Sequence, residues 1–264
     1  MAGTPCTVTR GIVLRETETK ETDKILTLLT DKFGKISAIA RGARRKGCKF
    51  AACAQPLVWS EWTLYQKGDW FYVNEGSTLE LFGGLRKDLD AMALGFYFAE
   101  LTEAVTAAGE PALDLLRHLL NGLYALGQMH KPSELVKPAF ELKLLSLAGY
   151  EPLADSCAYC GCPDPERPML DVVQGVVRCQ TCGTGERSLS MPLCPSSLAA
   201  LRHILYGDPK RLYSFRVGED ALQRLSHAAE AFAAAQLERG FRTLDFYKSL
   251  QGLPANPTKT ENKE

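Results

Sequence analysis

The sequence has no run of about 20 uninterrupted apolar residues, which is the length that a membrane-spanning helix needs. Its first residues, MAGTPCTVTRGIVLRETE, lack a basic start followed by an apolar block, so we expect no secretory signal. An excess of one charge is missing too, because 31 Lys and Arg balance 31 Asp and Glu. This balance excludes a globally basic nucleic-acid-binding protein. We therefore expect a soluble cytoplasmic protein that contacts no membrane.

Motifs of common enzyme classes are also missing. The sequence contains no G-x-S-x-G, no G-x-x-x-x-G-K-[ST], no H-E-x-x-H, and no G-x-G-x-x-G after a predicted strand. Two carboxylate pairs, Asp88 with Asp90 and Glu100 with Glu103, fall on predicted helices, where solvated helix faces explain them. We expect that the protein is not an enzyme.

The first 80 residues read as a small β-barrel. Segments rich in β-branched residues and aromatics (TVTRGIVLRE, KILTLLT, KISAIA, LVWSEWTLY and WFYVNEGSTLEL) are separated by two glycine-containing turns, DKFGK and QKGD. Five short strands of this kind predict an OB-fold barrel over residues 1–80. Strand faces alternate, so about half of its aromatic side chains must be core. The candidates are Phe33, Trp59, Trp62, Tyr65, Trp70, Phe71 and Tyr72.

From about residue 81 the hydrophobic period becomes helical. The pattern predicts an α-helical domain over residues 81–250 that begins with three packed helices, so the fold class is α+β multidomain. Ser133 is expected to cap a helix, Pro138 to mark a kink or a helix restart, and Gly149 to end a helix. A cysteine module over residues 154–190 interrupts the helices, and residues 251–264 are expected to form a disordered tail.

The cysteine module has the spacing of a metal site. Cys157-x2-Cys160 is followed after 18 residues by Cys179-x2-Cys182, which fits a four-cysteine zinc ribbon or knuckle. Cys162 is a fifth thiol that could replace Cys160. Two disulfides are disfavoured in a reducing cytoplasm, and a redox pair lacks a thioredoxin-like context, but an iron–sulfur cluster also fits four thiolates. A closed four-thiolate shell leaves no open position for hydrolysis, so we expect structural Zn²⁺.

A basic segment, ARGARRKGCK, follows the third predicted strand. Its cations are Arg41, Arg44, Arg45, Lys46 and Lys49. Residues 1–80 carry 12 basic and 9 acidic side chains, a net charge of +3, whereas residues 81–264 carry 19 and 22, a net charge of −3. A charged segment is usually a solvated loop, but OB barrels bind single strands with a basic groove and aromatic platforms. We therefore predict a nucleic-acid site here, with Arg10 and Lys35 as neighbours.

The order of these parts resembles the bacterial RecO family of recombinational repair. The resemblance covers about residues 7–250 and is most specific in LTDKFGKISAIARGARR, in FELKLLSLAGYEP before the first cysteine pair, and in RGFRTLDFYKSL. It implies an OB barrel, a helical bundle and a zinc module. It further implies a cytoplasmic, nucleoid-associated protein that binds single- and double-stranded DNA, anneals strands, and helps load RecA at gaps with RecR and single-strand-binding protein.

A different interpretation is a protein–protein scaffold with a structural barrel and little direct DNA contact. A partner tail that carries acids and aromatics would need an apolar pocket with a basic rim. In the helical part Arg117, Lys137 and Lys143 are the candidates for such a rim.

Overall fold

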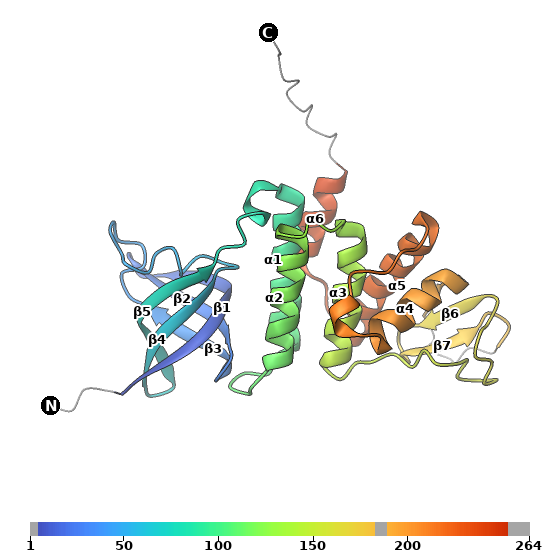
Figure 1. The fold of residues 1–264 in the computed structure, drawn as a ribbon. Coiled ribbons are helices and arrows are strands. Elements are labelled where there is room, and N and C mark those ends of the chain that lie inside the picture. Colours follow the sequence, from blue (N-terminus) through green and yellow to red (C-terminus); the bar gives the residue numbers. More distant parts are fainter. Residues whose placement is uncertain (1–4, 183–188, 253–264) are drawn as a thin grey trace, which may run out of the picture.

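We describe the chain from a computed structural model, whose described residues are 5–182 and 189–252. The molecule is elongated, with a β-barrel at one end, helices in the middle and a small β-sheet at the other end (Figure 1). The barrel has the order β1-β2-β3-β5-β4 and closes by pairing of β1 with β4. Its pairs are antiparallel except β3 with β5, which confirms the OB-type barrel. Its strands are β1 (Cys6–Thr19), β2 (Asp23–Thr30), β3 (Gly34–Ala40), β4 (Trp59–Lys67) and β5 (Trp70–Glu80).

Strand alternation decides which barrel side chains become core. In β4, Ser60, Trp62 and Leu64 are buried inside the barrel, and the residues between them face outward. The indole Nε1 of Trp62 donates to the carbonyl oxygen of Gly11 at 3.0 Å, so its one polar atom is satisfied. Residues 41–58 join β3 to β4 without regular structure. Ala43, Cys53 and Ala54 of this segment pack into the barrel core, whereas Leu57 packs into the core formed by the helices.

The turn between β2 and β3 touches the helical part of the chain. Gly34 has φ +60°, and a Cβ there would lie 1.7 Å from the carbonyl oxygen of Glu110. Beside it, the amide of Gly109 donates to the carbonyl oxygen of Lys35 at 3.0 Å. Only glycine fits this close backbone approach, which explains the glycine of the predicted DKFGK turn.

Six α-helices and two short 3₁₀ turns follow the barrel in the described part of the chain. The α-helices are α1 (Leu89–Val105), α2 (Leu113–Gly127), α3 (Ser133–Leu147), α4 (Pro195–Tyr206), α5 (Glu219–Leu237) and α6 (Arg242–Gln251). The 3₁₀ turns are η1 (Leu85–Lys87) and η2 (Pro209–Arg211). Asp88 and Asp90 are exposed, as expected, and the carboxylate of Asp88 also caps α1 by accepting from the amides of Asp90 and Ala91.

Helix α3 lies between two hydrophobic cores. One core packs α1, α2 and α6 against Phe140 and Leu144 of α3, and the other packs α4 and α5 against Leu142 and Leu145. One expectation for this helix was wrong: Ser133 is its first residue, with no side-chain capping bond. Pro138 lies inside the helix rather than at a restart, and its expected kink stays a prediction.

The cysteine module belongs to the second core. Its sheet has the order β7-β6-β8, with strands β6 (Pro168–Asp171), β7 (Val176–Cys179) and β8 (Ser190–Pro192). Leu170, Val172 and Val177 pack in the same cluster as α4 and α5, so the module shares its core with the helices. The expected disordered tail begins at Gln251, which ends α6, and lies outside the described residues from position 253 onward.

A buried ion pair stands at the centre of the helices. Nζ of Lys137 lies 2.9 Å from Oε1 of Glu141 and 3.3 Å from Oε2 of Glu230, and the hydroxyl of Tyr97 donates to Glu141 at 2.7 Å. Burial lowers the pKa of Lys137, but the two glutamates outweigh burial and raise it, so the amine stays charged. These four residues join α1, α3 and α5.

Replacing Lys137 with Met should destabilise the protein strongly. Glu141 is fully buried, so its carboxylate would lose its counter-ion without gaining access to water. We expect the free energy of unfolding to fall by about 3–5 kcal/mol in chemical denaturation. The control is Arg224→Met, which breaks the exposed pair with Asp220 at the same four-residue spacing and should cost about 0.5 kcal/mol. Equal losses in both variants would contradict this account.

Candidate nucleic-acid interface and metal centre

The basic loop is anchored at its start to the turn between β1 and β2. The amide of Gly42 donates to Oδ1 of Asp23 at 2.8 Å, and this bond holds the pKa of that carboxyl below its usual value. The amide of Arg44 donates to the carbonyl oxygen of Thr22 at 3.0 Å, and its guanidinium lies 3.1 Å from Glu18. The first part of the loop is therefore fixed to the barrel.

The second part of the loop presents unpaired cations. Arg45, Lys46 and Lys49 are exposed, and none of them has an ion-pair partner within residues 5–182 and 189–252. Gly47 between them has φ +82°, and a Cβ there would meet nothing within 4 Å. These three charges lie open to solvent, where a phosphate could approach.

Aromatic rings continue from the loop across the outer face of the barrel. The guanidinium of Arg41 lies 4.9 Å from the ring centre of Tyr72. Tyr72 pairs across β4 and β5 with Tyr65, and the two rings stack at 5.1 Å with an angle of 12°. Trp70, 44% exposed, stands opposite Lys67 in the same pair of strands. We call Arg41, Tyr65, Lys67, Trp70 and Tyr72 the aromatic face.

The remaining candidate aromatics lie elsewhere. Trp62 is fully buried, and Phe33 and Phe71 pack against the barrel core with their ring centres 5.1 Å apart. Trp59 packs against the core formed by the helices. Strand alternation alone would have identified the outward-facing aromatic residues once one residue of each strand had been assigned to the inner or the outer face. Lys67 was not predicted as a site residue because no other basic residue lies near it in the sequence.

Arg10 and Lys35, which were expected to neighbour the basic loop, lie away from it. Arg10 lies near the β2–β3 turn, where its amide donates to Asp31 and its side chain is 3.6 Å from Glu61. Nζ of Lys35 donates to the carbonyl oxygen of Glu103 at 2.6 Å, and burial lowers its pKa. Strand β3 begins beside Lys35 and ends at the basic loop, so Lys35 and the β2–β3 turn near Arg10 lie at the end of the barrel strands opposite to the loop.

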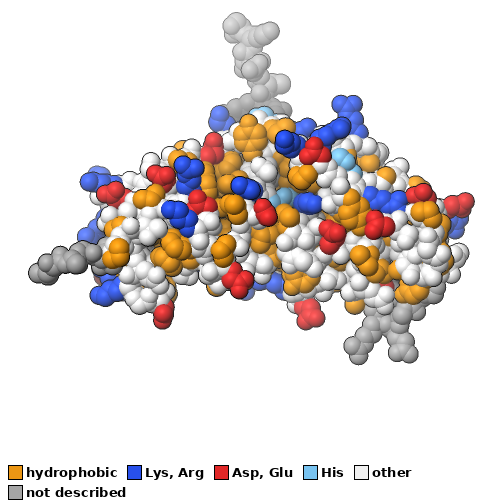
Figure 2. Space-filling view, turned by 60° about the horizontal axis from the view of Figure 1, so that its bottom comes forward, with side chains coloured by type: hydrophobic (Ala, Val, Ile, Leu, Met, Phe, Trp, Pro, Cys, Tyr) orange, Lys and Arg blue, Asp and Glu red, His pale blue; other side chains and the backbone are white. Residues whose placement is uncertain are grey.

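Acidic residues offset many of the basic ones over the rest of the surface. On the face shown in Figure 2, Lys and Arg side chains alternate with Asp and Glu over both the barrel and the helices. The net charge is zero because basic and acidic side chains are interspersed over the surface, so a site for an anion must be a local group of cations.

Two of the three candidate partner residues share a cleft in the helical part. Arg117 and Lys143 line a cleft of about 500 Å³, whose apolar surface includes Met129 and Leu147. Lys137 does not reach this cleft and is 5% exposed, because it holds the buried ion pair with Glu141. Its charge is therefore occupied inside the fold, and it offers no rim to a partner.

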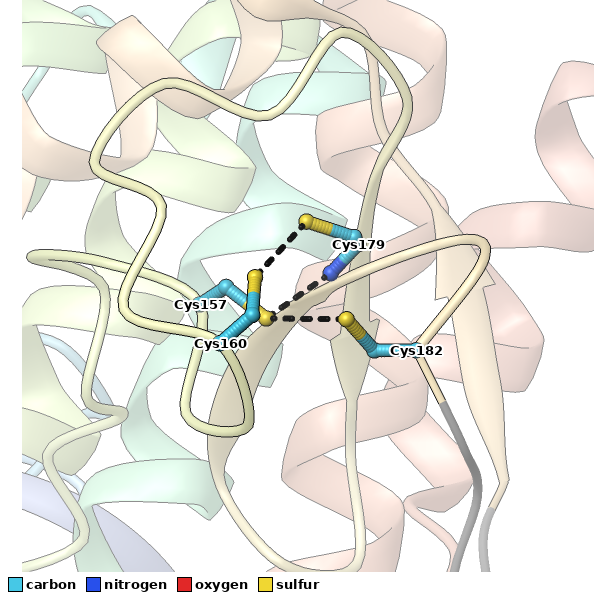
Figure 3. Close-up of side chains that lie close together, drawn as sticks. All are labelled: Cys157, Cys160, Cys179 and Cys182. Carbon is cyan, nitrogen blue, oxygen red and sulfur yellow. Dashed lines mark hydrogen bonds between the residues drawn. The ribbon is translucent and has the colours of Figure 1, made fainter.

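The four predicted metal ligands converge at the far end of the molecule (Figure 3). The sulfurs of Cys157, Cys160, Cys179 and Cys182 all lie within 4.8 Å of one another. Sγ of Cys157 is 3.7 Å from that of Cys182, and Sγ of Cys160 is 3.7 Å from that of Cys179. A disulfide requires about 2.05 Å, so these are four free thiols arranged around one point. Such a group could hold a metal ion.

The thiols differ in how readily they lose a proton. Burial would raise the pKa of Cys157, but amides of Cys160, Cys179 and Tyr159 donate to its sulfur and lower the pKa to about 6. Burial and the thiols of Cys160 and Cys157 raise the pKa of Cys179. A bound metal ion would stabilise all four sulfurs as thiolates.

Cys162 lies outside this group of sulfurs and contributes its carbonyl oxygen, which accepts from the amide of Cys157 at 2.8 Å. Gly161 has φ +71°, a left-handed conformation that glycine adopts without strain and that turns the chain after the first cysteine pair.

Glu100 and Glu103 were expected on a solvated face, and this was wrong. Glu103 accepts from Nη2 of Arg15 at 3.0 Å, which ties β1 to α1. Glu100 accepts from Arg239 at 3.2 Å and from the amide of Thr243 at 3.1 Å, which ties the start of α6 to α1. Both partners are far away in sequence, so no local pattern could have found them.

Within the described residues, no helix is both long and apolar enough to cross a membrane.

Family models match almost the whole chain. The model described as Recombination protein O N terminal matches residues 6–82, and the model described as Recombination protein O C terminal matches residues 86–245.

Curated relatives match over nearly their full lengths, and each is named DNA repair protein RecO. The protein from Acetivibrio thermocellus is 31% identical over 242 residues, covering 92% of this chain and 96% of its own. That from Symbiobacterium thermophilum is 31% identical over 245 residues, covering 91% and 96%. That from Thermoanaerobacter sp. is 28% identical over 245 residues, covering 93% and 98%. With both family models and these relatives in agreement, the chain belongs to the RecO family of DNA repair proteins.

Proposed function

We propose that this protein is a recombination mediator that binds single- and double-stranded DNA and anneals complementary strands. It would help to load RecA at gaps together with RecR and single-strand-binding protein, in the cytoplasm at the nucleoid. The names of its relatives support a role in DNA repair. The observation that carries the DNA-binding part is the aromatic face, where a guanidinium, two stacked tyrosines and an exposed tryptophan adjoin a loop of unpaired cations.

The chemistry of this role is electrostatic. Arg45, Lys46 and Lys49 release counter-ions from the phosphates, and the rings of the aromatic face stack on unpaired bases. Annealing requires two strands to be held together while their mutual repulsion is screened. It needs neither a catalytic acid nor a catalytic base, because no covalent bond is made or broken.

We further propose that the metal is zinc and that its role is structural. A zinc–thiolate bond of about 2.3 Å places tetrahedral sulfurs about 3.8 Å apart, and two of the observed sulfur pairs are separated by 3.7 Å. The small spread of the four sulfurs favours one central ion over a cluster of several irons. Four thiolates fill the shell, so the ion would fix the Cys157–Cys160 segment to β7.

The cleft beside α2 is our candidate site for the acidic tail of a partner such as single-strand-binding protein. Its apolar surface includes Tyr124, Met129 and Leu147, each at least 40% exposed, and its rim carries Arg117 and Lys143. The hydroxyl of Tyr213, also in its lining, is buried without a hydrogen-bond partner in the described structure. An acidic tail with aromatic residues would match both the charge and the apolar surface.

Neutralising the open cations of the loop should weaken DNA binding and its salt dependence together. We expect Arg45→Gln, Lys46→Gln and Lys49→Gln combined to reduce the slope of log affinity against log salt by about 2 for single strands, or about 0.7 per phosphate contact. The matched control changes Lys210, Arg211 and Arg216, three exposed cations of the helical part. Filter binding over a salt series measures both slopes. Wild-type affinity that does not change with salt would refute the phosphate contacts.

Removing the indole of Trp70 should lower affinity for single strands by about 1–3 kcal/mol, the usual loss for one stacked base. Duplex affinity should change less, because paired bases are already stacked on each other. Trp70→Ala carries the test and Trp70→Phe is the control that keeps an aromatic ring. Fluorescence anisotropy with labelled single and double strands measures the difference, and an equal loss for both substrates would argue against stacking.

Cys160→Ser should abolish metal binding, whereas Cys162→Ser should leave it intact, because the sulfur of Cys162 is outside the group. Elemental analysis of the wild type should give zinc in a one-to-one ratio with the chain. We expect the Cys160 variant to unfold at lower denaturant concentration and still bind DNA when folded, since the metal site and the barrel lie at opposite ends (Figure 1). Iron instead of zinc, or metal loss only in the Cys162 variant, would contradict the assignment.

A further inference from the structure

A second group of cations surrounds a cleft where the barrel meets the helices. The cleft has a volume of about 670 Å³ and lies between β1, β3, α1 and the connection from α5 to α6. The basic residues in its lining are Arg15, Lys35, Arg239 and Arg242. None of them belongs to the basic loop or to the aromatic face.

The acidic residues of the cleft already have partners. Glu103 is held by the guanidinium of Arg15 at 3.0 Å, and Glu100 by that of Arg239 at 3.2 Å. The third acid, Glu16, lies 2.7 Å from the amine of Lys24. Each acid in the lining is therefore neutralised by a neighbouring cation.

Two cations of the cleft remain without a carboxylate. The amine of Lys35 bonds only to a backbone carbonyl, that of Glu103. Arg242 is exposed at the first position of α6, and its side chain has neither a hydrogen bond nor an ion pair to any other described residue. The lining itself has four basic and three acidic residues, a net charge of +1, and Lys24 beside Glu16 raises the local excess to two positive charges, although the protein as a whole is neutral.

Strand β3 connects this cleft to the aromatic face. Its exposed or half-exposed residues alternate as Lys35, Ser37 and Ile39, and Arg41 follows on the same side directly after the strand. At about 3.3 Å per residue, Lys35 and Arg41 are about 20 Å apart along this outer surface. Stacked nucleotides of one strand rise about 3.4 Å each, so this distance corresponds to about six nucleotides.

We propose that the cleft is a second phosphate site, which takes the sugar–phosphate backbone of a single DNA strand after it has crossed the aromatic face. The proposal rests on the DNA-binding function proposed above and assigns to Lys35 and Arg242 a part in it. A short DNA strand bound only at the basic loop and the aromatic face would contact the outer surface of the barrel alone. A longer strand would also reach the cleft, within the about 4–16 nucleotides that single OB folds cover.

The variant Arg242→Gln tests this site without disturbing the fold, because Arg242 has no described partner. We would compare oligothymidylates of about 4 nucleotides, too short to reach from the aromatic face to the cleft, and of about 16 nucleotides by fluorescence anisotropy. Arg242→Gln should weaken binding of the long oligonucleotide about three- to fivefold, the size of an exposed ion pair, and leave the short one unchanged. The salt slope for the long oligonucleotide should fall by about 0.7.

Three further variants sharpen the comparison. Arg242→Glu should weaken the long oligonucleotide more than Arg242→Gln does, and Arg242→Lys should restore most of the wild-type affinity, because the contact needs only a positive charge. Arg216→Gln, an exposed cation outside the cleft, should have no effect at either length. The combined Arg45, Lys46 and Lys49 variant should weaken both lengths.

The outcomes separate the two proposals. If the wild type binds the short and the long oligonucleotide equally, or if Arg242→Gln and Arg216→Gln behave alike, the second site is refuted while DNA binding by the barrel stands. If the wild type binds neither length, the proposed DNA-binding function fails and the second site fails with it.

Discussion

The enclosure of α3 is the constraint on which the rest of the helical structure depends. This helix supplies Phe140 to the core beside the barrel and Leu142 to the core beside the cysteine module. It also carries two charged residues, Lys137 and Glu141, which can be buried only because they lie beside each other and beside Glu230. Helices α1 and α5 meet α3 through these polar contacts as well as through apolar packing, so the pairing of buried charge helps to set how the two cores are placed.

The candidate DNA-binding residues and the candidate metal site lie at opposite ends of the molecule. The barrel end carries the open cations and the rings of the aromatic face. At the other end, the four thiols close around a single point, and the sheet that holds them packs into the core of α4 and α5. A metal ion there would stabilise the far core, and its influence on DNA could reach the barrel only through α3 and the helices around it.

The sequence was sufficient where the signal is local. Alternation predicted the barrel strands, turn chemistry predicted Gly34, and cysteine spacing predicted the four converging sulfurs. It was insufficient where the partner is distant. Glu100 and Arg239 are 139 positions apart, so their ion pair is a product of tertiary packing. Lys137 was expected to be a surface cation, but residues 136–142 of α3 are all buried, so this stretch has no polar face to contrast with its apolar one. The two-residue alternation of a strand likewise sorts its side chains into two faces but does not show which face points into the barrel.

The boundary between the two family models, near residues 82–86, is not a boundary in the packing. Ile12, Leu14, Leu29 and Leu57 of the barrel region belong to the same core as α1, α2 and α6. A barrel cut away at this point would expose these four side chains to water, together with Trp59, as one apolar surface prone to self-association. For the same reason the two halves cannot be exchanged freely between relatives: a barrel from one RecO protein fits the helices of another only where these contacts are complementary.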